Sequence, residues 1–201
     1  MRNALTHLTA ADSRLAAVIE RVGPYAQEFA PPVFASLARS IVYQQLSTKV
    51  AATIYGRFQA ALAPDPVDAM GVLRLTHEEL RGFGFSNAKA IYVRSLAEKT
   101  LDGTVDFTRL PEMPDSGVIA HLTQVKGIGE WTAQMFLMFA LRRPDVLPCA
   151  DLGIRTAMKN VYHMRELPKP ARMEKVARPW RPYASVACWY LWRSLDNPAK
   201  M

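Results

Sequence analysis

Asp151 is the residue whose type and position suggest chemistry most strongly. Leu152, Ile154 and Met158 follow it at helical spacing, so the carboxylate stands where a helix should begin. An aspartate there is commonly an N-cap that binds backbone amides. The positive end of a helix also favours a charged carboxylate, which can stabilise a developing cation. The two interpretations are compatible, and the spacing leaves both open.

A second candidate is the glycine turn at residues 122–133, which reads LTQVKGIGEWTA. Gly127 and Gly129 permit a tight connection between two helices and the close approach of another backbone. The amides that begin the second helix suit an anion, Thr132 offers a hydroxyl, and Lys126 adds long-range attraction. This predicts a phosphate-binding hairpin, whereas the tripeptide alone also fits an ordinary turn between helices.

These residues must be positioned by helices, because apolar residues recur at helical spacing along nearly the whole chain. Ser47 and Ser86 are expected to cap two of the helices. Helices are predicted at residues 15–22, 33–43, 48–63, 66–73, 77–83, 87–100, 116–122, 130–141, 151–161, 171–177 and 182–195. The expected fold is therefore all-α, a two-lobed helical bundle. Residues 1–47 and 162–201 would form one lobe and residues 48–161 the other, with a catalytic cleft between them.

Composition narrows the class of partner. The 201 residues carry a formal net charge of +7, and residues 142–193 hold 11 Lys and Arg against 4 Asp and Glu. Such a basic face would attract a polyanion, although it also fits a surface kept for solubility. Cys149 and Cys188 lack metal-ligand spacing, and we see no signal peptide or membrane-spanning run. We expect a reduced, cytoplasmic protein with no membrane association.

Four stretches, in order, carry a resemblance to a known family: IVYQQLS (41–47), GFSNAKA (84–90), VKGIGEWTA (125–133) and PCADLG (148–153). They are similar to the helix-hairpin-helix DNA glycosylases, and most of all to the compact 3-methyladenine DNA glycosylase II family that lacks an N-terminal β domain. The resemblance covers most of the chain.

The resemblance implies base excision from double-stranded DNA that contains alkylated purines, with Asp151 as the single catalytic carboxylate. A purine alkylated at N3 or N7 already carries positive charge and leaves as a neutral base, so one carboxylate can suffice. Family members with lyase activity carry a nucleophilic lysine where this chain has Trp131, which implies a monofunctional enzyme. Substrates would be of the 3-methyladenine and 7-methylguanine class.

The resemblance also implies further site residues. The expected walls of the base pocket are Trp131, Trp189, Tyr43, Phe34 and Met135. The loop Gln44, Gln45, Leu46 and Ser47 would supply the wedge that fills the gap left by a flipped base, with Gln45 or Leu46 as the inserting residue. DNA contacts are expected from Gly127, Gly129, Thr132, Lys126, Ser86, Lys89 and Arg155, and less strongly from Lys159. Trp180, Tyr183, Tyr190 and Trp192 are expected in the core or in surface packing.

The backbone carbonyls of Thr123, Val125 and Ile128 match those that hold a monovalent cation in such hairpins, so a structural Na⁺ or K⁺ is implied and no other cofactor. A monomer is expected. Two alternatives stay open: a non-catalytic helix-hairpin-helix DNA-binding module, and a glycosylase for oxidised or mismatched bases. No four-cysteine tail is present, which excludes the iron–sulfur cluster of some relatives.

Overall fold

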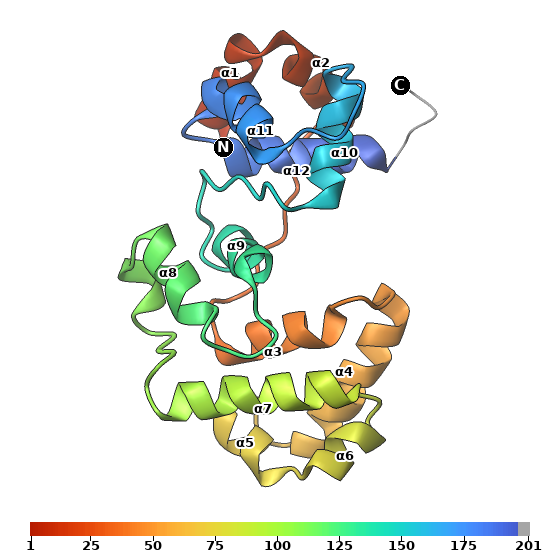
Figure 1. Cartoon of the computed structure of the whole chain (residues 1–201), viewed down its shortest axis with the longest axis vertical. Helices are drawn as coiled ribbons and strands as arrows, with labels where there is room; N and C mark the ends of the chain where they lie inside the picture. The colour runs from red at the N-terminus through yellow and green to blue at the C-terminus, as the bar shows by residue number, and fades with distance from the viewer. Residues whose placement is uncertain (197–201) are drawn as a thin grey trace. The chain divides into compact units, whose positions relative to one another are not determined.

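Helices form wherever the apolar periodicity predicts them, and one more precedes them (Figure 1). The computed structural model describes residues 1–196, and that part of the chain contains helices and no strand. The α-helices are α1 Arg2–Ala11, α2 Ser13–Val22, α3 Phe34–Tyr43, α4 Thr48–Leu62, α5 Ala69–Arg74, α6 His77–Gly82, α7 Asn87–Leu101, α8 Asp115–Leu122, α9 Glu130–Phe139, α10 Leu152–Val161, α11 Pro170–Ala177 and α12 Ala184–Leu195. Two 3₁₀ turns, η1 Leu110–Glu112 and η2 Arg178–Trp180, complete the described elements. The all-α prediction is confirmed.

Side-chain caps start several helices, as the sequence predicted at two of them. The Ser47 hydroxyl accepts a hydrogen bond from Val50 N at 3.4 Å, and the Ser86 hydroxyl accepts one from Lys89 N at 3.2 Å. Thr76 and Glu79 form a reciprocal capping box at α6. These caps satisfy amides that have no partner within the helix, so they fix where each helix begins.

The chain forms two units, residues 1–29 with 142–201 and residues 30–141. We name them unit 1 and unit 2. Both boundaries differ from those of the expected lobes, which were placed after residues 47 and 161. The reason is helix packing: α3 packs on α4 and α7 within unit 2, whereas α10 packs on α12 and α2 within unit 1. The expected cleft between lobes stays a prediction.

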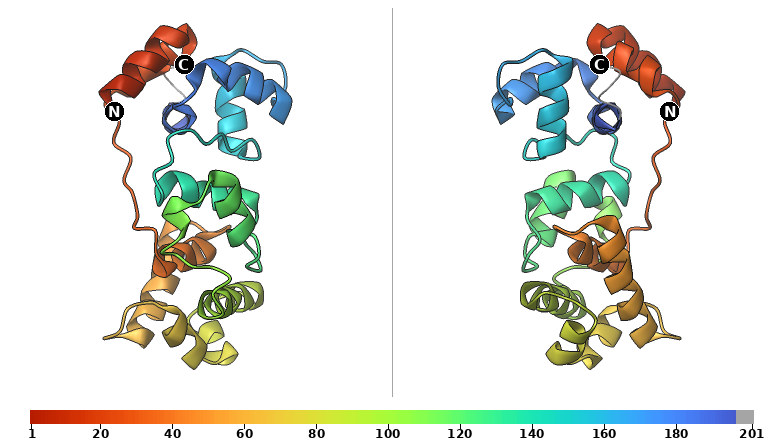
Figure 2. Two further views of the ribbon diagram at one scale, coloured as in Figure 1. Left: turned by 90° about the vertical axis from the view of Figure 1, so that its left-hand side faces the viewer. Right: turned by 90° about the vertical axis from the view of Figure 1, so that its right-hand side faces the viewer.

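Unit 2 is organised around the long helix α7, which lies against α3, α5 and α6 (Figures 1 and 2). Its apolar core includes aromatic pairs in edge-to-face contact, such as Phe58 with Phe85, whose ring centroids are 5.3 Å apart. Phe107 lies between Phe34 and Phe136 in a second group. This core fixes the faces of α3, α7 and α9 that carry the candidate site.

Unit 1 is organised around α12, which packs on α10 and α2 and buries most of its side chains. Ser185 attaches the segment before Asp151 to this helix: its hydroxyl donates to Arg143 O at 2.7 Å and accepts from Val146 N at 2.9 Å. Arg181 adds an ion pair to Asp145 at 3.1 Å. The approach to α10 is therefore held against α12 by directed polar contacts.

No helix within the described residues is long and apolar enough to cross a membrane.

Candidate base-excision site

The predicted hairpin is present within unit 2. It consists of α8, a turn at residues 123–129 and α9. Val125 and Ile128 are almost fully buried, and Ile128 N donates to Val125 O at 3.1 Å, so the turn is anchored by apolar side chains and closed by its own backbone. Lys126 is exposed, and its backbone amide donates to the Ser95 hydroxyl at 3.2 Å. The turn is thereby fixed against α7.

The two glycines of the turn differ in their backbone conformation and in the space that a side chain would have. Gly127 has φ +81°, and a Cβ added there would lie 2.1 Å from Cδ2 of Tyr92, so the ring of Tyr92 covers its backbone. Gly129 is the residue before α9, with φ −95°, and a Cβ there would meet no atom within 4 Å. A side chain could therefore be placed at Gly129 without a clash, whereas none fits at Gly127.

The three carbonyls predicted to hold a monovalent cation belong to this same turn. Hard carbonyl oxygens suit such an ion. The Val125 carbonyl already accepts one hydrogen bond, from Ile128 N, and keeps its second lone pair. The bound cation stays a prediction.

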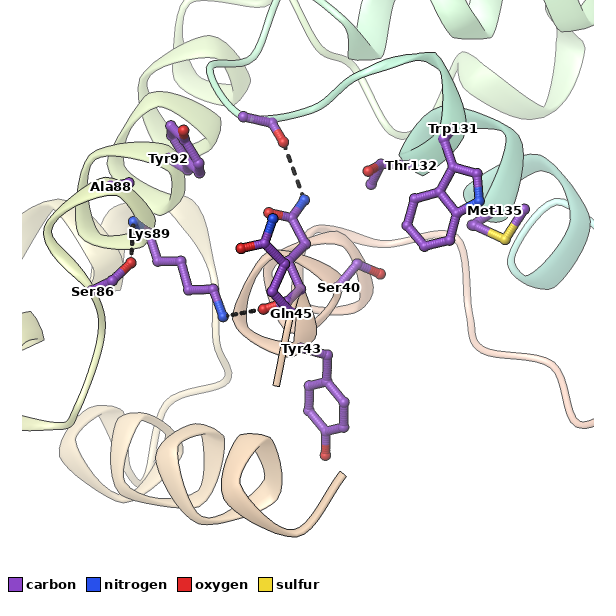
Figure 3. A pocket seen from close by; sticks show the side chains of 12 residues that line it. Ser40, Tyr43, Gln45, Ser86, Ala88, Lys89, Tyr92, Trp131, Thr132 and Met135 are labelled. Atoms are coloured by element: carbon purple, nitrogen blue, oxygen red, sulfur yellow. Dashed lines mark hydrogen bonds between the residues drawn. The ribbon is translucent and has the colours of Figure 1, made fainter. Parts of the chain in front are cut away.

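A cavity of about 680 Å³ lies beside the hairpin in unit 2 (Figure 3). Three of the residues expected in the base pocket line this cavity, Trp131 and Met135 from α9 and Tyr43 from the end of α3. Trp131 is 41% exposed, whereas most of the apolar side chains of α9 are buried. Thr132 also lines the cavity, and it is buried there rather than placed on the surface expected of a phosphate ligand.

The turn between α3 and α4 reaches the same cavity. Gln44 and Gln45 line it, whereas Leu46 is 38% exposed and is not among the lining residues. Gln45 is a non-glycine residue with positive φ, +56°. The Gln44 side-chain amide donates to the carbonyl of Gly127 at 3.1 Å, which joins this turn to the hairpin (Figure 3). The turn predicted to carry the wedge is thus held at the rim of the cavity.

Lys89 was expected to hold a phosphate, and the structure gives its ammonium another role. It donates to the carbonyls of Val42 at 2.7 Å and Gln44 at 2.5 Å. Partial burial lowers the pKa of this lysine. Two of its three N–H donors are therefore used within the protein.

Asp151 lies in unit 1, is 8% exposed and caps α10, as its position predicted. Its Oδ1 accepts a hydrogen bond from Ile154 N at 2.7 Å. The neighbouring thiol of Cys188 is fully buried, and burial raises its pKa, with a further contribution from the negative charge of Asp151. The thiol therefore stays protonated and is no rival nucleophile.

Trp192 is the site residue that the sequence reasoning missed. Its indole N–H donates to the same Oδ1 of Asp151 at 2.9 Å, although we expected this residue only in packing. Gly153 makes the contact possible, because a Cβ there would lie 3.0 Å from both the carboxylate oxygen and the indole nitrogen. A glycine two residues after an aspartate, at the start of a helix, was the available signal.

Three predicted site residues have other surroundings. Phe34 is buried against Phe107 and is not among the residues that line the cavity. Trp189 is buried in unit 1, where its ring contacts Tyr25 with centroids 4.7 Å apart. Arg155 donates from Nε to the carbonyl of Pro168 at 3.1 Å. The roles expected of these three residues in a base pocket or at a phosphate stay predictions.

The hairpin, the aromatic cavity beside it and a carboxylate at a helix start define a class of DNA repair protein. Residues 38–182 match the HhH-GPD superfamily of base excision DNA repair proteins, and the chain belongs to this superfamily. That match includes the hairpin and Asp151.

Relatives of known name agree. The chain is 33% identical over 173 residues to a putative DNA-3-methyladenine glycosylase of Bacillus subtilis. The aligned region covers 82% of this chain and 59% of that protein. It superposes on a DNA-3-methyladenine glycosidase of Bacillus halodurans with a TM-score of 0.87 and 38% identity, over 98% of this chain and 91% of the other. It superposes on a 3-methyladenine DNA glycosylase of Schizosaccharomyces pombe in complex with abasic DNA with a TM-score of 0.85 and 30% identity, over 96% and 97% of the two chains.

Proposed function

We propose that this protein is a monofunctional DNA glycosylase that flips alkylated purines out of duplex DNA and releases them by hydrolysis of the N-glycosidic bond. The observation that carries the proposal is the carboxylate of Asp151, buried at the start of α10 and bound by two N–H donors. Named relatives that act on 3-methyladenine support the substrate class.

The chemistry follows from where charge develops. Cleavage of the bond between sugar and base leaves an oxocarbenium-like cation on the deoxyribose, which a carboxylate stabilises and to which it can direct water. A purine alkylated at N3 or N7 leaves as a neutral base and needs little help from a general acid. Asp151 can therefore act alone.

The aromatic cavity of unit 2 would bind the flipped alkylated base. Electron-deficient bases favour the faces of aromatic rings, and Trp131, Tyr43 and Tyr92 line this cavity. Trp131 cannot form a Schiff base, which supports hydrolysis without strand cleavage.

DNA binding is assigned to the hairpin. The α9 amides bind a phosphate across the open space at Gly129, and Lys126 attracts the backbone. A Na⁺ or K⁺ on the carbonyls of Thr123, Val125 and Ile128 would neutralise part of the phosphate charge. The protein acts as a monomer on duplex DNA.

The direct test is base release from duplex DNA methylated with a radiolabelled reagent. We expect free 3-methyladenine and 7-methylguanine, and DNA strands that stay intact until alkali is added. Matched duplexes with 8-oxoguanine or a mismatched base serve as controls for the rival lesion classes. Release of those bases instead, strand cleavage without alkali, or tight binding without any release would overturn the proposal.

A further inference from the structure

The turn that follows α3 is held in a backbone conformation that its sequence does not favour. Gln45 has φ +56°, a backbone region that residues other than glycine rarely adopt. Such residues persist where surrounding contacts hold them, and they concentrate at functional sites. Gln45 is exposed and lines the cavity, so no burial of its own side chain explains the conformation.

Lys89 supplies the holding contact. Its ammonium donates to the carbonyl of Gln44, the first residue after α3 (Figure 3). It also donates to the carbonyl of Val42, in the last turn of α3. Cations at a helix C-terminus are favoured by the dipole, and charge-assisted hydrogen bonds are stronger than neutral ones. The lysine stands in the first turn of α7, whose own start is fixed by the Ser86 cap.

The turn has a second attachment on its other side. The Gln44 side-chain amide donates to the Gly127 carbonyl, and Gly127 is covered by the ring of Tyr92 from α7. Both attachments therefore lead back to α7, either directly through Lys89 or through the hairpin. Gln45 directly follows the attached residue Gln44, and its side chain lines the cavity.

We propose that Lys89 is a positioning residue for base flipping: it holds the turn after α3 so that the Gln45 side chain can enter the DNA stack. The proposal rests on the proposed function and adds a role to a residue outside the expected wedge loop. It replaces the expectation that Lys89 binds a phosphate, for which only one of its N–H donors remains.

The two roles of Lys89 make different predictions. A lost phosphate contact weakens binding to all DNA and reduces the salt slope of log K by about 0.9. A lost positioning contact leaves that slope unchanged and reduces the fraction of flipped base. The readouts are the salt dependence of binding and the fluorescence of 2-aminopurine placed at the flipped position.

The experiment compares Lys89→Met, Gln45→Ala and the double variant in single-turnover base release and in 2-aminopurine fluorescence. We expect Lys89→Met and Gln45→Ala each to lower release about tenfold or more, and the double variant to be no worse than Gln45→Ala alone, because the lysine acts through the glutamine. Lys99→Met is the matched control: it removes the same charge from the other end of α7, where Lys99 pairs with the exposed Asp102. It should leave release and flipping unchanged.

Independent losses that multiply in the double variant would overturn the proposal, as would a reduced salt slope in Lys89→Met with normal flipping. If Lys89→Met unfolds, Lys89→Gln replaces it, since its amide can still donate to one carbonyl. We then expect a smaller loss of base release, and again a double variant no worse than Gln45→Ala alone. Absence of base release by the wild-type protein would contradict the proposed function, and the flipping signal of the variants would still test the role of Lys89.

Discussion

The carboxylate of Asp151 is positioned by one backbone amide and one side chain distant in sequence. Ile154 N and the Trp192 indole N–H both bind Oδ1, so that oxygen is fixed in place. Gly153 leaves the room that this packing needs. Trp192 and Gly153, which carry no acidic or basic group, therefore both contribute to the orientation of the carboxylate.

We predict that Trp192→Phe slows base release about 10- to 100-fold, because a hydrogen bond to a charged group contributes roughly 1.5–3 kcal/mol. Affinity for abasic DNA should change little. Single-turnover release and binding by anisotropy check the two statements. Trp180→Phe is the control, since the Trp180 indole N–H donates to Asp12 instead; it should lower stability and leave the release rate of folded protein intact. Equal slowing of base release in both variants would contradict the role of the Trp192 hydrogen bond to Asp151.

At the scale of the element, the two glycines of the hairpin turn differ in what a side chain would meet. Gly127 is required by its positive φ and by the Tyr92 ring, so any side chain there disturbs the turn before it affects DNA. Gly129 is different: its φ of −95° and ψ of 176° are ordinary, and the space beside it is open. Gly129 is therefore the position at which phosphate binding can be changed without damage to the hairpin.

We predict that Gly129→Asp weakens DNA binding at least about tenfold, because one carboxylate would occupy the place of the phosphate charge. Aspartate is a favourable N-cap, so α9 should be no less stable. Gly129→Asn, which has the same shape and no charge, is the matched control and should lose clearly less affinity than Gly129→Asp, because it adds no repulsion of the phosphate. Anisotropy titrations between about 50 and about 200 mM salt measure the effect. Similar affinities for the two variants would contradict phosphate binding at this helix start.

At the scale of the molecule, Asp12 joins the N-terminal segment of unit 1 to its C-terminal segment. Its Oδ1 caps α2, and its Oδ2 accepts hydrogen bonds from Tyr162 at 2.6 Å and Trp180 at 2.9 Å. Burial alone would raise the pKa of Asp12, but hydrogen bonds from the indole, the phenol and two backbone amides together lower it. The charged form is therefore favoured in the folded protein.

This sets the direction of a pH effect on stability. A carboxyl with a pKa lowered by folding stabilises the protein above its ordinary pKa of 3.8, and that contribution disappears as the pH falls through the folded value. We predict that Asp12→Asn lowers Tm at neutral pH and that its gap from wild type shrinks below about pH 4. Thermal melts from neutral to acidic pH measure this. Asp65→Asn, which removes only an exposed ion pair, should have a small effect. A gap that stays constant with pH would contradict the role of the Asp12 charge.

Local signals predicted the helices, the Ser47 and Ser86 caps and the N-cap position of Asp151, because capping and periodicity act over a few residues. The helix α1 was missed, since its polar composition gives only two buried positions, Ala4 and Leu8. The Trp192 contact joins residues 41 positions apart, so periodicity did not reveal it, and Gly153 was its local sign in the sequence.

Large side chains were the least predictable. Phe34 and Trp189 are suitable for a pocket by type, and both are buried in apolar cores. Lys89 is suitable for a phosphate by charge, and its ammonium also bridges two backbone carbonyls. In each case residue type is shared between two environments, and only the packing of helices distant in sequence distinguishes them.

The central claim, that the Asp151 carboxylate drives base release, is tested most directly by Asp151→Asn in single-turnover release from methylated duplex DNA. Asparagine can still cap α10 through its carbonyl oxygen, so the fold and the affinity for abasic DNA should be retained while the negative charge is lost. The account predicts that 3-methyladenine release falls to background with abasic-DNA binding near the wild-type level. Release at the wild-type rate by a folded Asp151→Asn protein would contradict it.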